Sequence, residues 1–398
     1  MINLPDNLDK NSVTAKRKIK AVCVFGTRPE AIKMAPLVNR LKARPEFETM
    51  VLVTAQHREM LDIMLSSFNI TPDIDLNIMG KNQTLTDVTT KVLVGAGEVF
   101  EKERPDIVLV HGDTSTTFSA ALAAFYAGIT LGHVEAGLRT YNKREPFPEE
   151  INRCLTTQLA DLHFAPTINS KNNLLKENIP RKNIYVTGNT EIDSILDIVG
   201  REDNYVFSEN LLNSLDYGVK TIVMTAHRRE NLGKPMESCF KAIKRIVNDN
   251  KDIQLVYPVH LNPKVRETAG KIFGGAERIH LLEPLAVTDM YHLINKSYMV
   301  VTDSGGIQES APALNKPCVV LRNVTERPEG VETGVLTLAG TEEENVYSSI
   351  DRLIHDAKHY GVMAGAKNPF GDGKASDRII SSILYHFNII ANRPLDFE

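Results

Sequence analysis

The stretch that decides the fold runs from Val110 to Arg153 and reads VHGDTSTTFSAALAAFYAGITLGHVEAGLRTYNKREPFPEEINR. Short apolar runs at residues 107–110 and 129–131 predict two strands. The small and apolar residues 115–127 between them predict a tightly packed crossover helix, which joins parallel neighbours in one sheet. The stretch therefore predicts an open, parallel α/β sheet.

Three acidic residues follow these predicted strands. Asp113 and Glu135 each come two residues after a histidine, at the carboxyl end of a predicted strand, where ligands of open α/β sheets bind. Glu149 follows Pro148, which suits the first turn of a helix and places Glu149 near the positive end of the helix. Three carboxylates at one sheet edge repel one another unless cations or a reaction require them. They are therefore candidates for catalysis.

Two other interpretations apply to these acids. Asp113 precedes Thr114 and Ser115, so it is also a candidate helix N-cap. The two histidine–acid pairs would also suit a zinc or manganese ion. No Cys or third His has convincing ligand spacing, so the sequence favours a site without a metal.

Length and composition favour a two-domain globular protein. The chain has 398 residues, of which 42% are hydrophobic, enough for a core in each domain. A formal net charge of −4 argues against a nucleic-acid partner. The four cysteines form no CxxC motif and are interpreted as reduced packing residues, which fits the cytoplasm. No run approaches a membrane span, and the polar residues 1–18 are expected to be a disordered tail.

Two rounds of strand–loop–helix alternation predict two Rossmann-like, doubly wound parallel-sheet domains of the α/β class that face a cleft. The predicted strands cover residues 19–25, 49–54, 107–110, 129–131, 162–165 and 183–187, and then 221–225, 253–258, 279–282, 299–302 and 318–321. The domains are expected at residues 19–187 and 188–371. A final helix at residues 375–392, within the segment 372–398, is expected to return to the first domain.

An anion site is predicted at residues 302–309, TDSGGIQE, which read as a strand, a glycine turn and a helix start. The glycines let the backbone approach a phosphate, and Glu309 suits a ribose diol. An ordinary capped turn is the alternative. Arg28, His227 and Arg327 also follow predicted strands and are further donors. Neither G-x-G-x-x-G in its required context nor a Walker A motif occurs, which argues against NAD and ATP hydrolysis.

Ten segments spread from about Ile19 to the final predicted helix form a specific pattern. They are GTRPEAIKMAPL (26–37), TAQHREMLD (54–62), HGDT (111–114), GHVEAGLRT (132–140), PEEINR (148–153), TAHRREN (225–231), YPVHLNP (257–263), TDSGGIQES (302–310), ERPEG (326–330) and GDGKAS (371–376). In this pattern the chain resembles the non-hydrolysing UDP-N-acetylglucosamine 2-epimerases. The resemblance implies a GT-B-like fold, a homodimer, no cofactor, and interconversion of UDP-N-acetylglucosamine and UDP-N-acetylmannosamine.

The resemblance also implies roles for single residues. The catalytic set falls on Asp113, Glu135, Glu149 and His227, the last beside the leaving nucleotide. Substrate or pyrophosphate contacts fall on Arg28, Lys33 and Arg153, and the UDP site falls on Ser304, Gly305, Gly306, Glu309 and Arg327. Some bacterial members bind a second substrate molecule as an activator, at positions matched here by Gln56 and Gln83. The pattern departs at Glu59 and Asn82, where those members often have Gln and Arg.

Epimerisation at C2 of an N-acetylhexosamine needs more than one base, because the C2 hydrogen is not beside a carbonyl group. If UDP departs, C1 gains oxocarbenium character and elimination gives a 2-acetamidoglucal. Reprotonation on the opposite face then gives the epimer. This chemistry needs an acid or base on each face, a carboxylate near C1 and cations at the pyrophosphate. Asp113, Glu135 and Glu149 are assigned to these tasks as a set.

Three other functions fit parts of the pattern. A GT-B glycosyltransferase would use a similar nucleotide site together with an acceptor groove. A hydrolysing epimerase would let water capture C1 and release free N-acetylmannosamine and UDP. A non-enzymatic sensor of sugar nucleotides would not need three clustered acids, whose mutual repulsion is unfavourable.

Overall fold

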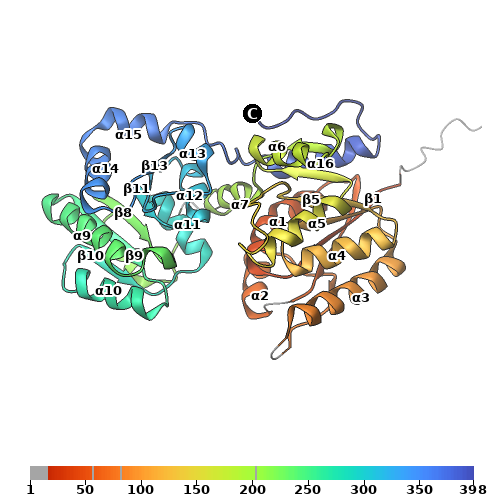
Figure 1. The fold of residues 1–398 in the computed structure, drawn as a ribbon, viewed down its shortest axis with the longest axis horizontal. Helices are drawn as coiled ribbons and strands as arrows, with labels where there is room; N and C mark the ends of the chain where they lie inside the picture. Colours follow the sequence, from red (N-terminus) through yellow and green to blue (C-terminus); the bar gives the residue numbers. More distant parts are fainter. Residues whose placement is uncertain (1–16, 56–57, 81–82, 202–203) are drawn as a thin grey trace, which may run out of the picture. The chain divides into compact units, whose positions relative to one another are not determined.

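A computed structural model describes residues 17–55, 58–80, 83–201 and 204–398 (Figure 1). Most of the predicted tail, residues 1–16, therefore lies outside the described residues. The chain divides into two compact units. The first comprises the residues up to Val134 together with Thr140–Leu162, and the second comprises Glu135–Arg139 and His163–Glu398. The predicted domain boundaries at residues 187 and 371 stay a prediction.

The described strands form two parallel sheets, in the orders β3-β2-β1-β4-β5-β6-β7 and β10-β9-β8-β11-β12-β13. The strands of the first sheet are β1 (Ile19–Phe25), β2 (Phe47–Val53), β3 (Ile74–Asp75), β4 (Ile107–His111), β5 (Thr130–Val134), β6 (Leu162–Ala165) and β7 (Ile184–Val186). Those of the second are β8 (Lys220–Thr225), β9 (Ile253–Pro258), β10 (Ile279–Leu282), β11 (Met299–Thr302), β12 (Cys318–Val320) and β13 (Leu336–Leu338).

Both sheets share one topology, because the second repeats the order 3-2-1-4-5-6 when its strands are numbered from β8. This is the order of doubly wound nucleotide-binding sheets, in which ligands bind where the strand order reverses. The reversal lies between β1 and β4 in the first sheet and between β8 and β11 in the second. The predicted α/β class with two doubly wound parallel sheets is confirmed.

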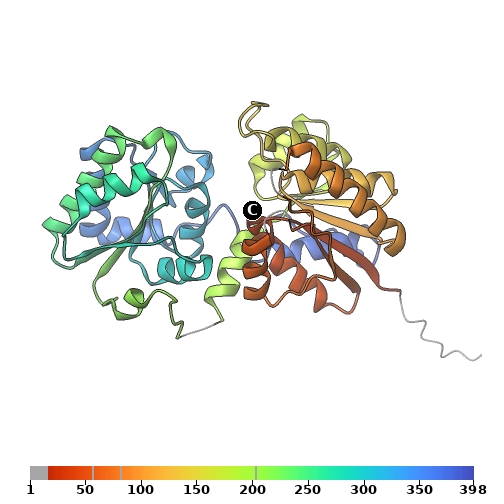
Figure 2. The ribbon, with the colours of Figure 1, turned by 90° about the horizontal axis from the view of Figure 1, so that it is seen from below.

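Helices lie on both faces of each sheet (Figure 2). Their bounds are α1 (Arg28–Lys42), α2 (Arg58–Ser67), α3 (Leu85–Glu103), α4 (Ser115–Tyr126), α5 (Glu149–Leu159), α6 (Ile168–Lys176), α7 (Thr190–Val199), α8 (Asn210–Ser214), α9 (Lys234–Asp249), α10 (Pro263–Phe273), α11 (Val287–Lys296), α12 (Gly305–Ala313), α13 (Pro328–Glu332), α14 (Glu343–His355), α15 (Ala357–Ala364) and α16 (Ala375–His386). Because helices cover both faces of each sheet, the central strands are continuous apolar runs and do not alternate between apolar and polar residues. β4, for example, is buried at every position.

Each unit has its own apolar core. In the first unit, side chains of β1, β4 and β5 pack against α3 and α4, whose small residues allow close approach. In the second, side chains of β8, β9 and β11 pack against α9, α10 and α14. Burial raises the pKa of the Cys23 and Cys239 thiols to about 12, which fits their predicted role as packing residues. No helix in the described ranges is long and apolar enough to cross a membrane.

The structure adds elements that the sequence did not predict. β3 and β13 have two and three residues, too few to show a strand periodicity. Helix α7 was also missed, although Asn189 caps it by accepting a hydrogen bond from the Glu191 N–H. The predicted final helix to residue 392 ends at His386, because Asn388 adopts a left-handed φ of 57°.

The loop after β5 has an unusual backbone. Glu135 has a φ of 63° and Gly137 a φ of 91°, both in the left-handed region. Within the second unit the loop is held by a hydrogen bond from the Ala136 N–H to the Phe164 carbonyl, at 3.0 Å. The Asn173 amide also donates to the Gly137 carbonyl at 3.0 Å. Neighbouring backbone therefore fixes the position of Glu135.

We expect Gly137→Ala to lower the thermal unfolding midpoint clearly. A Cβ at this position would lie 2.3 Å from the Ser170 carbonyl oxygen, and the left-handed φ alone costs an L-residue about 1–2 kcal/mol. Gly334→Ala is the matched control, since Gly334 has a φ of 80° but an added Cβ would meet no atom within 4 Å. Equal shifts for the two variants would contradict the close approach at Gly137.

Residues 393–398 run beside β7. The Phe397 N–H donates to the Val186 carbonyl at 2.7 Å, and the Asp396 carboxylate accepts from the Val186 N–H at 3.0 Å. Arg393 donates to the carbonyls of Lys182 and Ile184, at 2.6 Å each. The segment therefore occupies the hydrogen-bonding edge of the last strand of the first sheet.

Candidate active site

Asp113 lies directly after β4, at the reversal point of the first sheet. Helix α4 begins with Thr114 as its N-cap, whose hydroxyl accepts the Thr117 N–H, so the alternative interpretation of Asp113 as an N-cap is wrong. The Asp113 carboxylate instead accepts a short hydrogen bond from the Arg153 guanidinium, and the Asn152 amide donates to the Asp113 carbonyl at 3.0 Å. Helix α5 thus holds both the backbone and the side chain of Asp113.

The start of α5 carries two acids with different surroundings. Glu149 is half-buried and opens the helix, as predicted, although Pro148 is the residue before the first turn instead of within it. Glu150 is buried, accepts the backbone N–H of Tyr141 at 2.8 Å and pairs with Arg153 at 3.3 Å. Glu150 therefore anchors the preceding loop. Glu149 is the candidate catalytic acid at the start of the helix.

The loop after β1 is tied to the loop after β4 by Glu30, which sequence reasoning missed. The buried Glu30 carboxylate accepts the Gly26 and Thr27 N–H groups at 3.0 and 2.8 Å. It also accepts the hydroxyls of Thr114 and Thr117, at 2.7 and 3.0 Å. Glu30 therefore fixes the two segments that carry Arg28 and Asp113.

The predicted basic residues of the first unit lie on α1 and α5. Arg28 is exposed at the first position of α1, and Lys33 is half-buried one turn further along. Arg153 is largely buried between the carboxylates of Asp113 and Glu150. All three are cations of the kind that an anion would contact, and Arg153 also pairs with two carboxylates.

In the second unit, Glu309 and Arg327, which are predicted to bind the ribose and the phosphates, contact each other. Arg327 donates a short hydrogen bond to Glu309, whose other oxygen accepts the Asn189 amide at 2.6 Å. The charge of Glu309, and more weakly that of Glu135, holds the pKa of Arg327 above its usual range. Glu135, Glu309 and Arg327 therefore belong to one electrostatic cluster.

Helix α12 begins after β11, as predicted, but Gly305 and Gly306 are its first two residues instead of a turn before it. Ser304 precedes the helix and its side chain makes no capping hydrogen bond. Cβ atoms added at Gly305 and Gly306 would come no closer than 3.7 Å to other atoms, which is an ordinary van der Waals distance. The atom nearest to a Cβ added at Gly305 belongs to the guanidinium of Arg228. The sequence alone offered no reason to prefer Arg228 over its neighbour Arg229.

His227 follows β8 and faces a buried carboxylate. Its Nδ1 lies 3.4 Å from the Asp303 carboxylate, and its ring stacks on that of His260 with centroids 5.1 Å apart. Partial burial lowers the pKa of His227 below 6.5, although the negative charge of Asp303 acts to raise it. A lowered pKa favours the neutral ring at pH 7. Sequence reasoning named His227 but missed Asp303 and His260.

The predicted activator residues are only partly described. Gln56 lies outside the described residues, as does Asn82. Gln83 donates its side-chain amide to the Ile78 carbonyl, before α3. Over the described ranges, no group of three or more His, Cys, Asp or Glu side chains is arranged to hold a metal ion.

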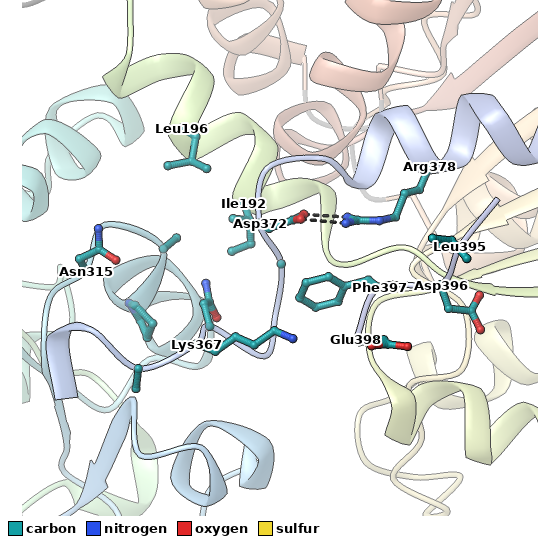
Figure 3. A pocket seen from close by; sticks show the side chains of 15 residues that line it. Ile192, Leu196, Asn315, Lys367, Asp372, Arg378, Leu395, Asp396, Phe397 and Glu398 are labelled. Carbon is teal, nitrogen blue, oxygen red and sulfur yellow. Dashed lines mark hydrogen bonds and ion pairs between the residues drawn. The ribbon is translucent and has the colours of Figure 1, made fainter. Parts of the chain in front are cut away.

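A cavity of about 730 Å³ lies in the second unit and is lined by residues other than the candidate site residues (Figure 3). Leu196, Asn315, Lys367 and Phe397 contribute to its wall, and Arg378 there is paired with Asp372 at 2.7 Å. None of the predicted catalytic or nucleotide-binding residues lines it. Its volume alone therefore does not mark the active site.

Comparisons with known proteins agree over nearly the whole chain. A family model described as UDP-N-acetylglucosamine 2-epimerase matches residues 39–384. The UDP-N-acetylglucosamine 2-epimerase of Bacillus subtilis is 56% identical over 381 residues, covering 96% of this chain and 99% of that protein. A crystal structure of a UDP-N-acetylglucosamine 2-epimerase is similar at 54% identity, with a TM-score of 0.89 and coverage of 96% and 100%. The Neisseria meningitidis UDP-GlcNAc 2-epimerase bound to UDP-GlcNAc is 45% identical, with a TM-score of 0.79 and coverage of 92% and 100%.

Two parallel sheets with the same doubly wound order define a GT-B-like α/β protein, and the structural neighbours share this fold. The match of the family model and the identity to curated relatives extend over most of the chain. The chain belongs to the UDP-N-acetylglucosamine 2-epimerase family. This is a family of isomerases, so the chain is an enzyme and the resemblance seen in its motifs is confirmed.

Proposed function

We propose that the chain catalyses the reversible epimerisation of UDP-N-acetylglucosamine at C2 to UDP-N-acetylmannosamine, by elimination of UDP and re-addition. Family membership supports the overall reaction, as does the relative with bound UDP-GlcNAc. The observation that carries the mechanism is the placement of Asp113. This carboxylate is at the reversal point of the first sheet, does not serve as an N-cap, and is held by a largely buried arginine.

The bond from C1 to the pyrophosphate oxygen breaks first, and its electron pair leaves with UDP. A carboxylate then takes the C2 proton, which forms the C1=C2 double bond of 2-acetamidoglucal. For the return, an acid delivers a proton to the other face of C2 and the diphosphate oxygen bonds to C1. We assign Asp113, Glu135 and Glu149 to proton transfer and to stabilising charge at C1, because such steps need positioned carboxyl groups on both faces.

The departing UDP is stabilised by groups of opposite charge. The N–H groups at the start of α12, next to Ser304, Gly305 and Gly306, suit the phosphates. Arg327 supplies a permanent cation, while Glu309 suits the ribose hydroxyls. Arg28, Lys33 and Arg153 are the proposed cations for the substrate from the first unit, and His227 is proposed to lie beside the leaving diphosphate.

Heavy water tests the elimination. We expect the epimer formed from UDP-N-acetylglucosamine in heavy water to carry deuterium at C2, because the proton that returns comes from an exchanged acid. Proton NMR would show loss of the C2 signal as the product accumulates. Product formed at the normal rate with its hydrogen retained at C2 would overturn the mechanism. Stoichiometric release of UDP with free N-acetylmannosamine would instead identify a hydrolysing enzyme.

The homodimer implied by the resemblance and the cytoplasmic location expected from the cysteines stay predictions. Exposed apolar side chains of the first unit, Val94 on α3 with Phe125 and Tyr126 on α4, suit a subunit contact. Sedimentation equilibrium of the purified chain decides between a monomer and a dimer.

A further inference from the structure

Asp303 is a completely buried carboxylate that joins the segments after β8 and β11. It accepts the backbone N–H of His227 at 2.9 and 3.1 Å with its two oxygens, and that of Arg228 at 2.9 Å. The Asn231 amide donates a further hydrogen bond at 3.3 Å. These donors stabilise a charge whose burial would otherwise be strongly unfavourable.

Peptide N–H groups do not need a charged acceptor, since a neutral carbonyl oxygen would accept them. The charge of Asp303 has another neighbour, Nδ1 of His227, which lies 3.4 Å from Oδ1. A carboxylate beside one imidazole nitrogen favours the tautomer with the proton on that nitrogen. Nε2 of His227 then carries the lone pair of the neutral ring.

The face of the His227 ring is held as well. His260, which follows β9, stacks on it with an angle of 16° between the ring planes. The Asn262 N–H donates to Nδ1 of His260 at 3.1 Å, so the proton of neutral His260 is on Nε2. His227 is thus fixed at one edge by a carboxylate and on one face by a second imidazole.

The charges around His227 make its protonation depend on a bound anion. Burial lowers its pKa, Asp303 and Glu230 oppose the shift, and His260 and Arg228 add to it. A diphosphate beside the ring adds negative charge, and this favours the imidazolium. Protonation of Nε2 would then accompany binding of the nucleotide.

We propose that Asp303 is a positioning residue for His227: it keeps a proton on Nδ1 and leaves Nε2 to take up a second proton when the diphosphate binds. The protonated Nε2 donates to an oxygen of the departing diphosphate and thereby stabilises the charge that develops as the C1–O bond breaks. The proton comes from solvent and returns there when the nucleotide leaves. The proposal rests on the proposed function for the identity of the anion.

The tautomer is measured directly by ¹⁵N-histidine NMR of the full chain, with the His227 signals assigned from His227→Gln. We expect the proton of neutral His227 on Nδ1 in the unaltered protein, and a shift toward Nε2 in Asp303→Asn. Asp289→Asn is the matched control, because Asp289 is equally buried in the same unit but binds Tyr205 and Ser208. A proton on Nε2 in the unaltered protein would overturn the proposal, whether or not any variant folds.

Proton uptake gives a second readout. Calorimetric titration with UDP at pH 7, in two buffers of different ionisation enthalpy, should show net uptake that is reduced by Asp303→Asn and by His227→Gln but not by Asp289→Asn. Turnover should fall about 10–100-fold in Asp303→Asn with a smaller change in KM, and hardly further when His227→Gln is added. Unchanged uptake, or fully additive losses, would contradict a role through His227.

The alkaline limb of the pH–rate profile should move to lower pH in Asp303→Asn, because the lost carboxylate stabilises the imidazolium that must donate to the diphosphate. A limb that stays in place would count against the proposal. If the chain epimerises nothing, the proposed function fails, while the tautomer and the proton uptake still decide the role of Asp303.

Discussion

Asp113→Asn, Glu135→Gln and Glu149→Gln are each expected to lower turnover about 10²–10⁴-fold, the usual loss when a positioned acid or base is removed. Each change keeps nearly the same side-chain shape. In Asp113→Asn, Arg153 retains its pair with Glu150, so its guanidinium does not become a buried charge without a partner. Initial rates of epimer formation, followed by NMR at saturating substrate, measure the loss.

Folding controls separate chemistry from structure in this series. The thermal unfolding midpoints of the three variants should stay close to that of the unaltered protein. Glu145→Gln is the matched carboxylate control, since Glu145 is exposed four residues before Glu149 and is outside the proposed catalytic set. Full turnover in any of the three variants would remove that acid from the mechanism, and an equal loss in Glu145→Gln would make the effect unspecific.

Arg327→Ala should weaken UDP binding about 10–150-fold, which corresponds to about 1.5–3 kcal/mol for a lost charge-assisted hydrogen bond. The structure adds a second reason, since Glu309 would lose its paired cation and its negative charge would oppose the phosphates. Calorimetry with UDP measures the affinity.

Two further variants sharpen this test. Arg245→Ala removes an arginine that pairs with Glu344 on the surface of the same unit, and it should leave UDP affinity unchanged. Adding Glu309→Gln to Arg327→Ala should recover part of the loss if repulsion by Glu309 contributes to it. Unchanged affinity in Arg327→Ala would take this arginine out of the nucleotide site.

Much of the fold follows from local sequence. Strands such as β4 and β11 are continuous apolar runs, and polar or glycine-rich segments follow them, so the parallel order and the strand ends could be predicted together. The edge strands β3 and β13 were not predicted, because neither is a continuous apolar run and each forms a strand only by pairing with one neighbour.

The candidate site likewise contains residues that could be predicted from the sequence and residues that could not. Residues directly after central strands, such as Asp113 and His227, were predicted because topology alone brings strand ends to one edge. Glu30 and Asp303 were not, since their roles depend on which backbone N–H groups lie within about 3 Å, a tertiary fact that motif spacing does not contain. The left-handed backbone at Glu135 was equally hidden, although Gly137 marked the loop.

The segment beside β7 bears on how the protein behaves at high concentration. An open parallel sheet ends in strands whose unpaired N–H and C=O groups are templates for strands of other molecules. Here Arg393, Asp396 and Phe397 already use the hydrogen-bonding groups of that outermost strand. The chain thereby protects its own sheet from intermolecular β-pairing at this end, and the residues after α16 act as a built-in safeguard against aggregation.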